Sequence, residues 1–178
     1  MSEIIALDFG TTNSVLAVAD SNGNVQSATF EVGQSSFDTY RTILYFWEEQ
    51  KLTTPGAPIS LQSCSGPFAM AEYLKESQDC RLIQSIKSYL ASKDFEGTEI
   101  FGNVYTIEDL IATFLTQIHH HAQYSLGGLG YRVISGRPVA FAGTNPDNDY
   151  AEMRLRAAYE QAGFEVEAMV FEPLAASY

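Results

Sequence analysis

Apolar residues recur along the chain with two different spacings, and the change of spacing separates a strand-rich first part from a helix-rich second part. Residues 4–7 form a continuous apolar run ending at Asp8, which is typical of a buried strand. Turn-forming residues follow, so this run and the next are expected to form a hairpin around Gly10. Residues 50–68 are rich in proline and glycine and are expected to be mostly loop, with a short strand near Ile59. Apolar or aromatic runs bounded by turns predict strands at 4–7, 15–19, 25–30 and 41–47.

The second part follows the helical period. Between 107 and 124 the apolar residues fall at steps of three and four, which places them on one stripe of a helix. Thr106 is a candidate N-cap for this helix, and Glu108 and Asp109 lie in its first turn, where the helix dipole favours acidic side chains. The remaining pattern predicts helices at 69–77, at 149–162 and from Glu172-Pro173 onward, and strands at 132–138 and 166–171.

This order of elements predicts an α/β fold whose central sheet has mixed strand direction and is flanked by helices. Hairpins make antiparallel neighbours, whereas strand–helix–strand crossovers make parallel ones. At 178 residues the chain is long enough to bury a core of its own, and 46% of its residues are hydrophobic.

Charge and cysteine content narrow the classes of function. The chain carries 10 basic and 22 acidic residues, a formal charge of −12, which argues against unaided binding to nucleic acid or to an anionic membrane surface. A nucleotide could still bind, because backbone N–H groups and Mg²⁺ can meet its phosphates locally. Cys64 and Cys80 have no metal-binding or redox spacing, which fits a reducing compartment. With no signal-peptide pattern and no long apolar run, a cytoplasmic protein is expected.

The first candidate for chemistry is the segment Asp8-Phe-Gly-Thr-Thr-Asn-Ser14. A tight glycine turn can direct several backbone N–H groups to one point and so hold an anion, while a carboxylate at the end of the preceding strand can hold Mg²⁺ directly or through water. The segment is not a Walker A loop, because it lacks the terminal Gly-Lys-Ser/Thr. An ordinary hairpin turn explains the same residues equally well.

Three further candidates carry weaker signals. Glu172-Pro173 is compatible with a carboxylate that orders a metal-bound water, or with a plain helix start. Lys87 could pair with phosphoryl oxygens, although a single lysine is typical of a solvated surface. His119-His120-His121 lacks the spacing of a helical zinc site, so we expect His121 to pack and the other two to face solvent.

Taken together, these segments resemble the Hsp70 ATPase domain of the actin/Hsp70/sugar-kinase superfamily. Residues 5–14 resemble the first phosphate motif, I-D-L-G-T-T-x-S, and 84–90 resemble the segment that carries the catalytic lysine. Residues 136–141 resemble the V-P-A-x-F strand end and 154–163 the helix after it, while 170–176 resemble N-E-P-T-A-A-A. The chain has G-R-P in place of V-P-A, and in this it resembles divergent bacterial Hsp70-like proteins.

The resemblance implies ATP and Mg²⁺ as ligands. It places Gly10, Thr11, Thr12 and Asn13 at the nucleotide phosphates and Asp8 near the hydration shell of Mg²⁺. Family members usually have an aromatic residue where Asn13 stands and a threonine where Leu174 stands, which affects the positioning of phosphate and water.

The resemblance also implies that Lys87 and Glu172 orient the attacking water and the γ-phosphate. Pro138 and Arg156 match a proline switch and its arginine partner, which relay the nucleotide state to a peptide-binding domain. Unfolded peptides or co-chaperones are then partners of the full-length protein.

The second phosphate motif, D-x-G-G-G-T, and the adenosine motif do not occur in the sequence, and in this family both belong to the second lobe. We therefore expect the first lobe of an actin-like (ribonuclease H-like) ATPase domain, with a core subdomain from 1–30 and 131–178 and a smaller α+β subdomain inserted at 31–130. A lobe of a sugar or small-molecule kinase of the same superfamily, or a non-catalytic interaction module on this fold, are the alternatives.

Overall fold

The computed structural model describes residues 4–50, 59–75, 79–143 and 146–172. Its centre is a mixed sheet in the order β13-β12-β1-β2-β3, with the short β6 also paired to β2. β1 is antiparallel to β2 but parallel to β12, which in turn is parallel to β13, so the predicted mixed direction is confirmed. The strands are β1 (Ile5–Asp8), β2 (Asn13–Ala19), β3 (Val25–Ser27), β6 (Tyr40–Arg41), β12 (Arg132–Arg137) and β13 (Glu165–Phe171).

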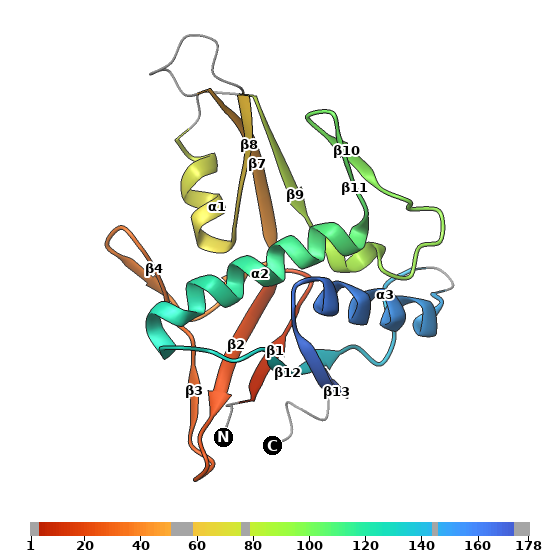
Figure 1. The fold of residues 1–178 in the computed structure, drawn as a ribbon. Coiled ribbons are helices and arrows are strands. Elements are labelled where there is room, and N and C mark those ends of the chain that lie inside the picture. Colours follow the sequence, from red (N-terminus) through yellow and green to blue (C-terminus); the bar gives the residue numbers. More distant parts are fainter. Residues whose placement is uncertain (1–3, 51–58, 76–78, 144–145, 173–178) are drawn as a thin grey trace.

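A second group of strands projects beyond the central sheet (Figure 1). It is a three-stranded antiparallel sheet in the order β8-β7-β9, with helix α1 packed beside it. Two small hairpins, β4–β5 and β10–β11, complete the strands. The bounds are β4 (Phe30–Val32), β5 (Ser35–Phe37), β7 (Ile43–Gln50), β8 (Ile59–Ser65), α1 (Gly66–Tyr73), β9 (Cys80–Gln84), β10 (Thr98–Ile100) and β11 (Asn103–Tyr105).

Helices α2 (Ile107–Leu126) and α3 (Asn148–Gln161) lie across one side of the central sheet (Figure 1). The predicted cap of α2 is present as a reciprocal capping box, because Thr106 Oγ1 accepts from the Asp109 amide while the Asp109 carboxylate accepts from the Thr106 amide. The apolar stripe of α2 is buried against alternate residues of β1 and β2 in one continuous core. Within the described residues, no helix is both long enough and apolar enough to cross a membrane.

Three sequence predictions need correction. The single strand expected at 25–30 is divided into β3 and β4, because the chain leaves the sheet after Ala28, whose amide bonds to the Leu16 carbonyl, and Phe30 packs against Tyr40. The short strand expected near Ile59, within a stretch expected to be mostly loop at 50–68, is present as the seven-residue strand β8, which is longer than expected and pairs along β7. The helix expected at 69–77 begins earlier, at Gly66, and ends at Tyr73.

The histidine prediction is partly wrong. His119 is buried rather than solvent-facing, because its ring stacks on Tyr131 and bonds to the Gly130 carbonyl at the turn after α2. His120 is exposed, as expected. His121 packs as predicted, with its ring stacked on Phe68.

Candidate functional site

The candidate site lies at the carboxyl end of β1, beside the carboxyl ends of β12 and β13. After β1 the chain forms the neighbouring strand β2 on one side of the sheet, whereas after β12 it forms the neighbouring strand β13 on the opposite side. The strand order therefore reverses between β1 and β12. In open α/β sheets, ligands bind outside the carboxyl ends of strands at such a reversal. Asp8 ends β1 and Glu172 follows β13, so both carboxylates belong to this edge.

Lys87 reaches the same edge from a distant part of the chain. It lies in the short 3₁₀ helix η1 (Ile86–Tyr89), and its ammonium Nζ is 2.5 Å from Glu172 Oε1 and 5.8 Å from the centre of the Phe9 ring. Only 5% of Lys87 is exposed, against 34% of Glu172. Lys87 is therefore not a solvated surface lysine, because its charge is balanced inside the protein by a specific carboxylate.

Asp8 lies close to this ion pair. Its side chain reaches solvent, yet surrounding protein partly desolvates it, and this burial, together with the nearby negative charge of Glu172, raises the pKa of Asp8. The positive charge of Lys87 acts in the opposite direction on that pKa. Two carboxylates held near each other and near one buried ammonium are typical of a functional site rather than of a surface salt bridge.

Gly136 is a site residue that the sequence reasoning did not single out. A Cβ atom built on Gly136 would lie 3.3 Å from Asp8 Oδ1 and 3.4 Å from Glu172 Cγ, so any side chain at this position would enter the space between the two carboxylates. A glycine inside a strand often marks such a close approach, and this was the available signal.

The turn that follows Asp8 is held in a tight conformation. A Cβ atom on Gly10 would overlap the carbonyl oxygen of Asn13, so only glycine fits this position. The Thr12 carbonyl accepts a 2.7 Å hydrogen bond from the Thr42 amide, which ties the turn to the neighbouring segment. Thr11, Thr12 and Asn13, in the turn that follows Asp8, are exposed to solvent.

Comparison with known proteins finds a distant relative. The chain is similar to the "Chaperone protein DnaK" of two strains of Halobacterium salinarum. The identity is 29% over 175 residues, which cover 98% of this chain and 24% of each relative. No protein-family model matches the chain. The similarity is distant, and it supports an Hsp70-like, chaperone-related relationship. The chain spans about a quarter of the length of these relatives.

The donor set at this edge fits a hydrated Mg²⁺ better than a caged metal. Among the described residues, no group of three or more His, Cys, Asp or Glu side chains is arranged to hold an ion. A cation beside Asp8 would therefore take most of its oxygen ligands from water and phosphate, which is the coordination that Mg²⁺ prefers. Burial, and after it the charge of Glu172, raises the pKa of Asp8, and a cation beside Asp8 would favour its ionised form.

Three other predicted positions have separate outcomes. Arg156 donates to the Val166 carbonyl at 3.4 Å, so it joins α3 to β13, and its switch role with Pro138 stays a prediction. Leu174 lies outside the described residues.

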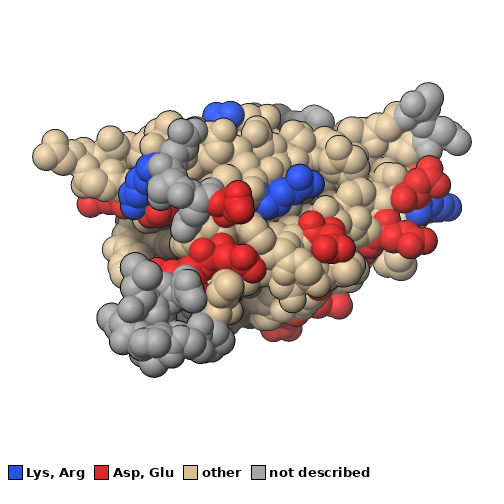
Figure 2. Space-filling model, turned by 90° about the horizontal axis from the view of Figure 1, so that it is seen from above, with Lys and Arg blue, Asp and Glu red and all other residues tan. Residues whose placement is uncertain are grey.

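The face of the molecule seen from above carries no broad basic patch outside the part covered by grey atoms (Figure 2). Figure 2 shows acidic and basic side chains interspersed on the face seen from above, outside the part covered by grey atoms. A phosphate at the site would therefore depend on local groups rather than on a basic surface.

Proposed function

We propose that the chain is the N-terminal lobe of an Hsp70-like domain that binds and hydrolyses ATP in a chaperone-related protein. The observation that carries this proposal is the buried Lys87–Glu172 pair beside Asp8, at the carboxyl ends of parallel strands. The sequence similarity to DnaK supports the same assignment.

Each residue of the site has a role in this proposal. The backbone N–H groups of the Gly10–Asn13 turn and the hydroxyls of Thr11 and Thr12 bind the β- and γ-phosphates, and Asp8 holds the water shell of Mg²⁺. ATP supplies the phosphoryl group, and Mg²⁺ neutralises the charge on its oxygens. Lys87 donates toward the γ-phosphate, while the Glu172 carboxylate orients the attacking water.

The proposed organisation has a core subdomain at 1–30 and 131–178 and an inserted subdomain at 31–130. Two features support it: the central sheet takes nearly all its strands from the two outer segments, and β7, β8 and β9 form a separate sheet from the middle one. The mixed strand order is compatible with an actin-like fold. A second lobe from the full-length protein would close the site over Asp8 and the Gly10 turn.

Binding and turnover test the proposal in two steps. We expect the 178-residue chain alone to bind Mg-ATP poorly in calorimetry, because half of the phosphate contacts and the base pocket belong to the second lobe. Micromolar binding by the chain alone would contradict this division of the site. We expect the full-length protein to hydrolyse ATP, and Lys87→Met to reduce kcat strongly.

Lys93→Gln is the matched control for this substitution. Lys93 lies six residues further along the chain and forms an exposed pair with Asp147, so its loss should leave turnover unchanged. Equal rates in wild type and Lys87→Met would remove Lys87 from catalysis and favour the non-catalytic module. Turnover that requires an added sugar would favour the kinase alternative.

A further inference from the structure

The position of the segment that carries Lys87 depends on its contacts with the rest of the chain, because the segment contains little regular structure of its own. It begins at Ser85, which adopts the left-handed conformation at φ 56° although it is not glycine. It continues through short turns in which the Leu90 amide bonds to the Lys87 carbonyl and the Ser92 amide bonds to the Tyr89 carbonyl. Such turns are tighter and less stable than an α-helix, so the position of Lys87 depends on what fixes the segment.

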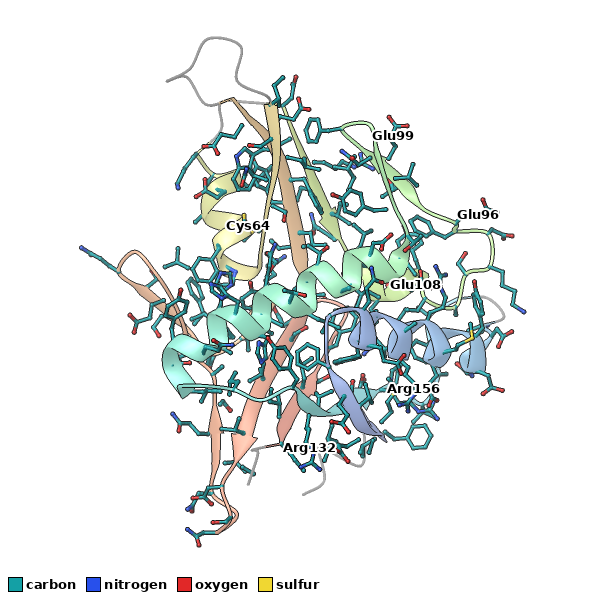
Figure 3. The ribbon with its side chains drawn as sticks, viewed as in Figure 1. Cys64, Glu96, Glu99, Glu108, Arg132 and Arg156 are labelled. Atoms are coloured by element: carbon teal, nitrogen blue, oxygen red, sulfur yellow. The ribbon has the colours of Figure 1, made fainter. Side chains whose placement is uncertain are left out.

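Arg154 of α3 fixes the far end of this segment. Its Nη1 donates to the Ser92 carbonyl at 3.2 Å, while its Nε and Nη2 donate to the two carboxylate oxygens of Glu108 at 2.5 and 3.0 Å. Arg154 is only 4% exposed. Glu108 lies where the N-terminal end of α2 approaches α3 (Figure 3). One guanidinium thus joins α2, α3 and the Lys87 segment.

The chemistry of this junction requires arginine. A guanidinium presents several donors in a rigid plane, so it can bind a carboxylate with two nitrogens and still direct a third N–H elsewhere. A lysine has a single nitrogen at the end of a flexible stem, and it could satisfy the charge of Glu108 without also holding the Ser92 carbonyl in the same geometry. Although burial raises the pKa of Glu108, its hydrogen bonds and charge interaction with Arg154 keep that pKa below the usual value, so the carboxylate stays ionised.

We propose that Arg154 is a positioning residue for Lys87. Arg154 is anchored on Glu108 and holds the Ser92 carbonyl. This contact fixes the segment 85–92 and so determines where the Lys87 ammonium lies relative to Glu172. The catalytic consequence of this rests on the proposed function. The positioning itself does not, because it concerns only contacts within the chain.

The reactivity of the Lys87 amine tests the positioning. An amine-reactive acetylating reagent modifies Lys87 only when the segment opens, and mass spectrometry reads each lysine separately. We expect Arg154→Lys to raise the acetylation rate of Lys87 about tenfold, the equivalent of one lost hydrogen bond to a charged group. Amide hydrogen exchange should increase over 86–92 but not within the central sheet. A merely structural role of Arg154 would instead raise exchange everywhere in proportion to the lost stability.

Matched variants make the result decisive. Lys93→Gln breaks an exposed ion pair with Asp147 immediately after the segment, so it should change Lys87 reactivity less than twofold. Glu108→Gln weakens the ion pair that anchors Arg154 and should give a smaller increase in the acetylation rate of Lys87. This variant also tests the proposal if Arg154→Lys does not fold. Lys87 reactivity within twofold of wild type in both Arg154→Lys and Glu108→Gln would overturn the proposal.

Turnover in the full-length protein separates the two proposals. We expect Arg154→Lys to lower kcat up to about a hundredfold with little change in KM for ATP, because a displaced Lys87 affects the chemical step more than binding. If the wild-type protein does not hydrolyse ATP, the proposed function fails, and the acetylation result still decides the role of Arg154. A reactive Lys87 with unchanged kcat would overturn the catalytic consequence.

Discussion

The Lys87–Glu172 pair allows a quantitative prediction, because its two partners differ in burial. Removing one partner of a fully buried ion pair costs about 3–5 kcal/mol of unfolding free energy. Glu172 keeps contact with water, with 34% of it exposed, so the cost should be reduced. We therefore expect Lys87→Met and Glu172→Gln each to lower the free energy of unfolding by about 2 kcal/mol. The double variant should lose about 2 kcal/mol less than the sum of the two.

Urea unfolding measures these values, followed by circular dichroism and by the fluorescence of Trp47, the single tryptophan of the chain. The penalty of Lys87→Met should also depend on pH. Without the ammonium, Asp8 and Glu172 repel each other when both are ionised, so the penalty should be larger at pH 7 than in mild acid. A coupling energy below about 0.5 kcal/mol, or a penalty that does not vary with pH, would refute the pairing of these groups in solution.

Four further predictions concern single positions. Gly10→Ala should lower the unfolding free energy by about 2 kcal/mol or more in urea titrations, because the new methyl group overlaps a carbonyl oxygen of the turn. Tyr159→Phe should cost about 1 kcal/mol in the same assay, since the buried hydroxyl accepts a 2.8 Å hydrogen bond from Ser135. Burial, with the charge of His120, lowers the pKa of His121 to about 4. The folded protein should therefore lose stability as the pH falls from about 6.5 toward 4, because in that range only the unfolded chain binds the proton. His121→Gln should flatten this pH dependence, and an NMR titration of His121 would check the pKa. Because the pKa of Asp8 is raised, Asp8→Asn should stabilise the fold at neutral pH, and thermal unfolding should show the advantage vanishing as pH falls below the unfolded value near 3.8.

Elements with strong local signals could be predicted from the sequence. Helix α2 has an N-cap, acidic residues in its first turn and a long apolar stripe, and its described bounds exceed the prediction by two residues at the C-terminal end. The β1–β2 hairpin follows from two apolar runs around a glycine turn. In these places local propensity and tertiary packing favour the same structure.

Features that depend on distant partners could not be predicted. Strand β8 has a polar sequence, and it is longer than expected because β7 offers seven residues of antiparallel register. His119 is buried by the chain that returns after α2, which helical spacing alone does not reveal. The burial of Lys87 likewise depends on Glu172, 85 residues later in the chain. Periodicity records which face of an element is apolar, but it does not record which residues meet across the fold.

The residues of the candidate site reduce the stability of the fold, which is informative about why they are present. Asp8 is held where burial and the charge of Glu172 oppose its ionisation, although asparagine in its place would remove that penalty. Gly136 lets the two carboxylates approach closely, because a Cβ atom there would crowd Asp8 Oδ1 and Glu172 Cγ. Lys87 is buried with a charge that requires Glu172 as its partner, whereas apolar residues at both positions would need no such pairing. Carboxylates held close together beside a buried ammonium favour local charge over stability, and such positions are better explained by a ligand than by folding. A magnesium-bound phosphate would supply the positive charge that the carboxylates lack and the negative charge that Lys87 can meet, so these costs favour the proposed nucleotide site.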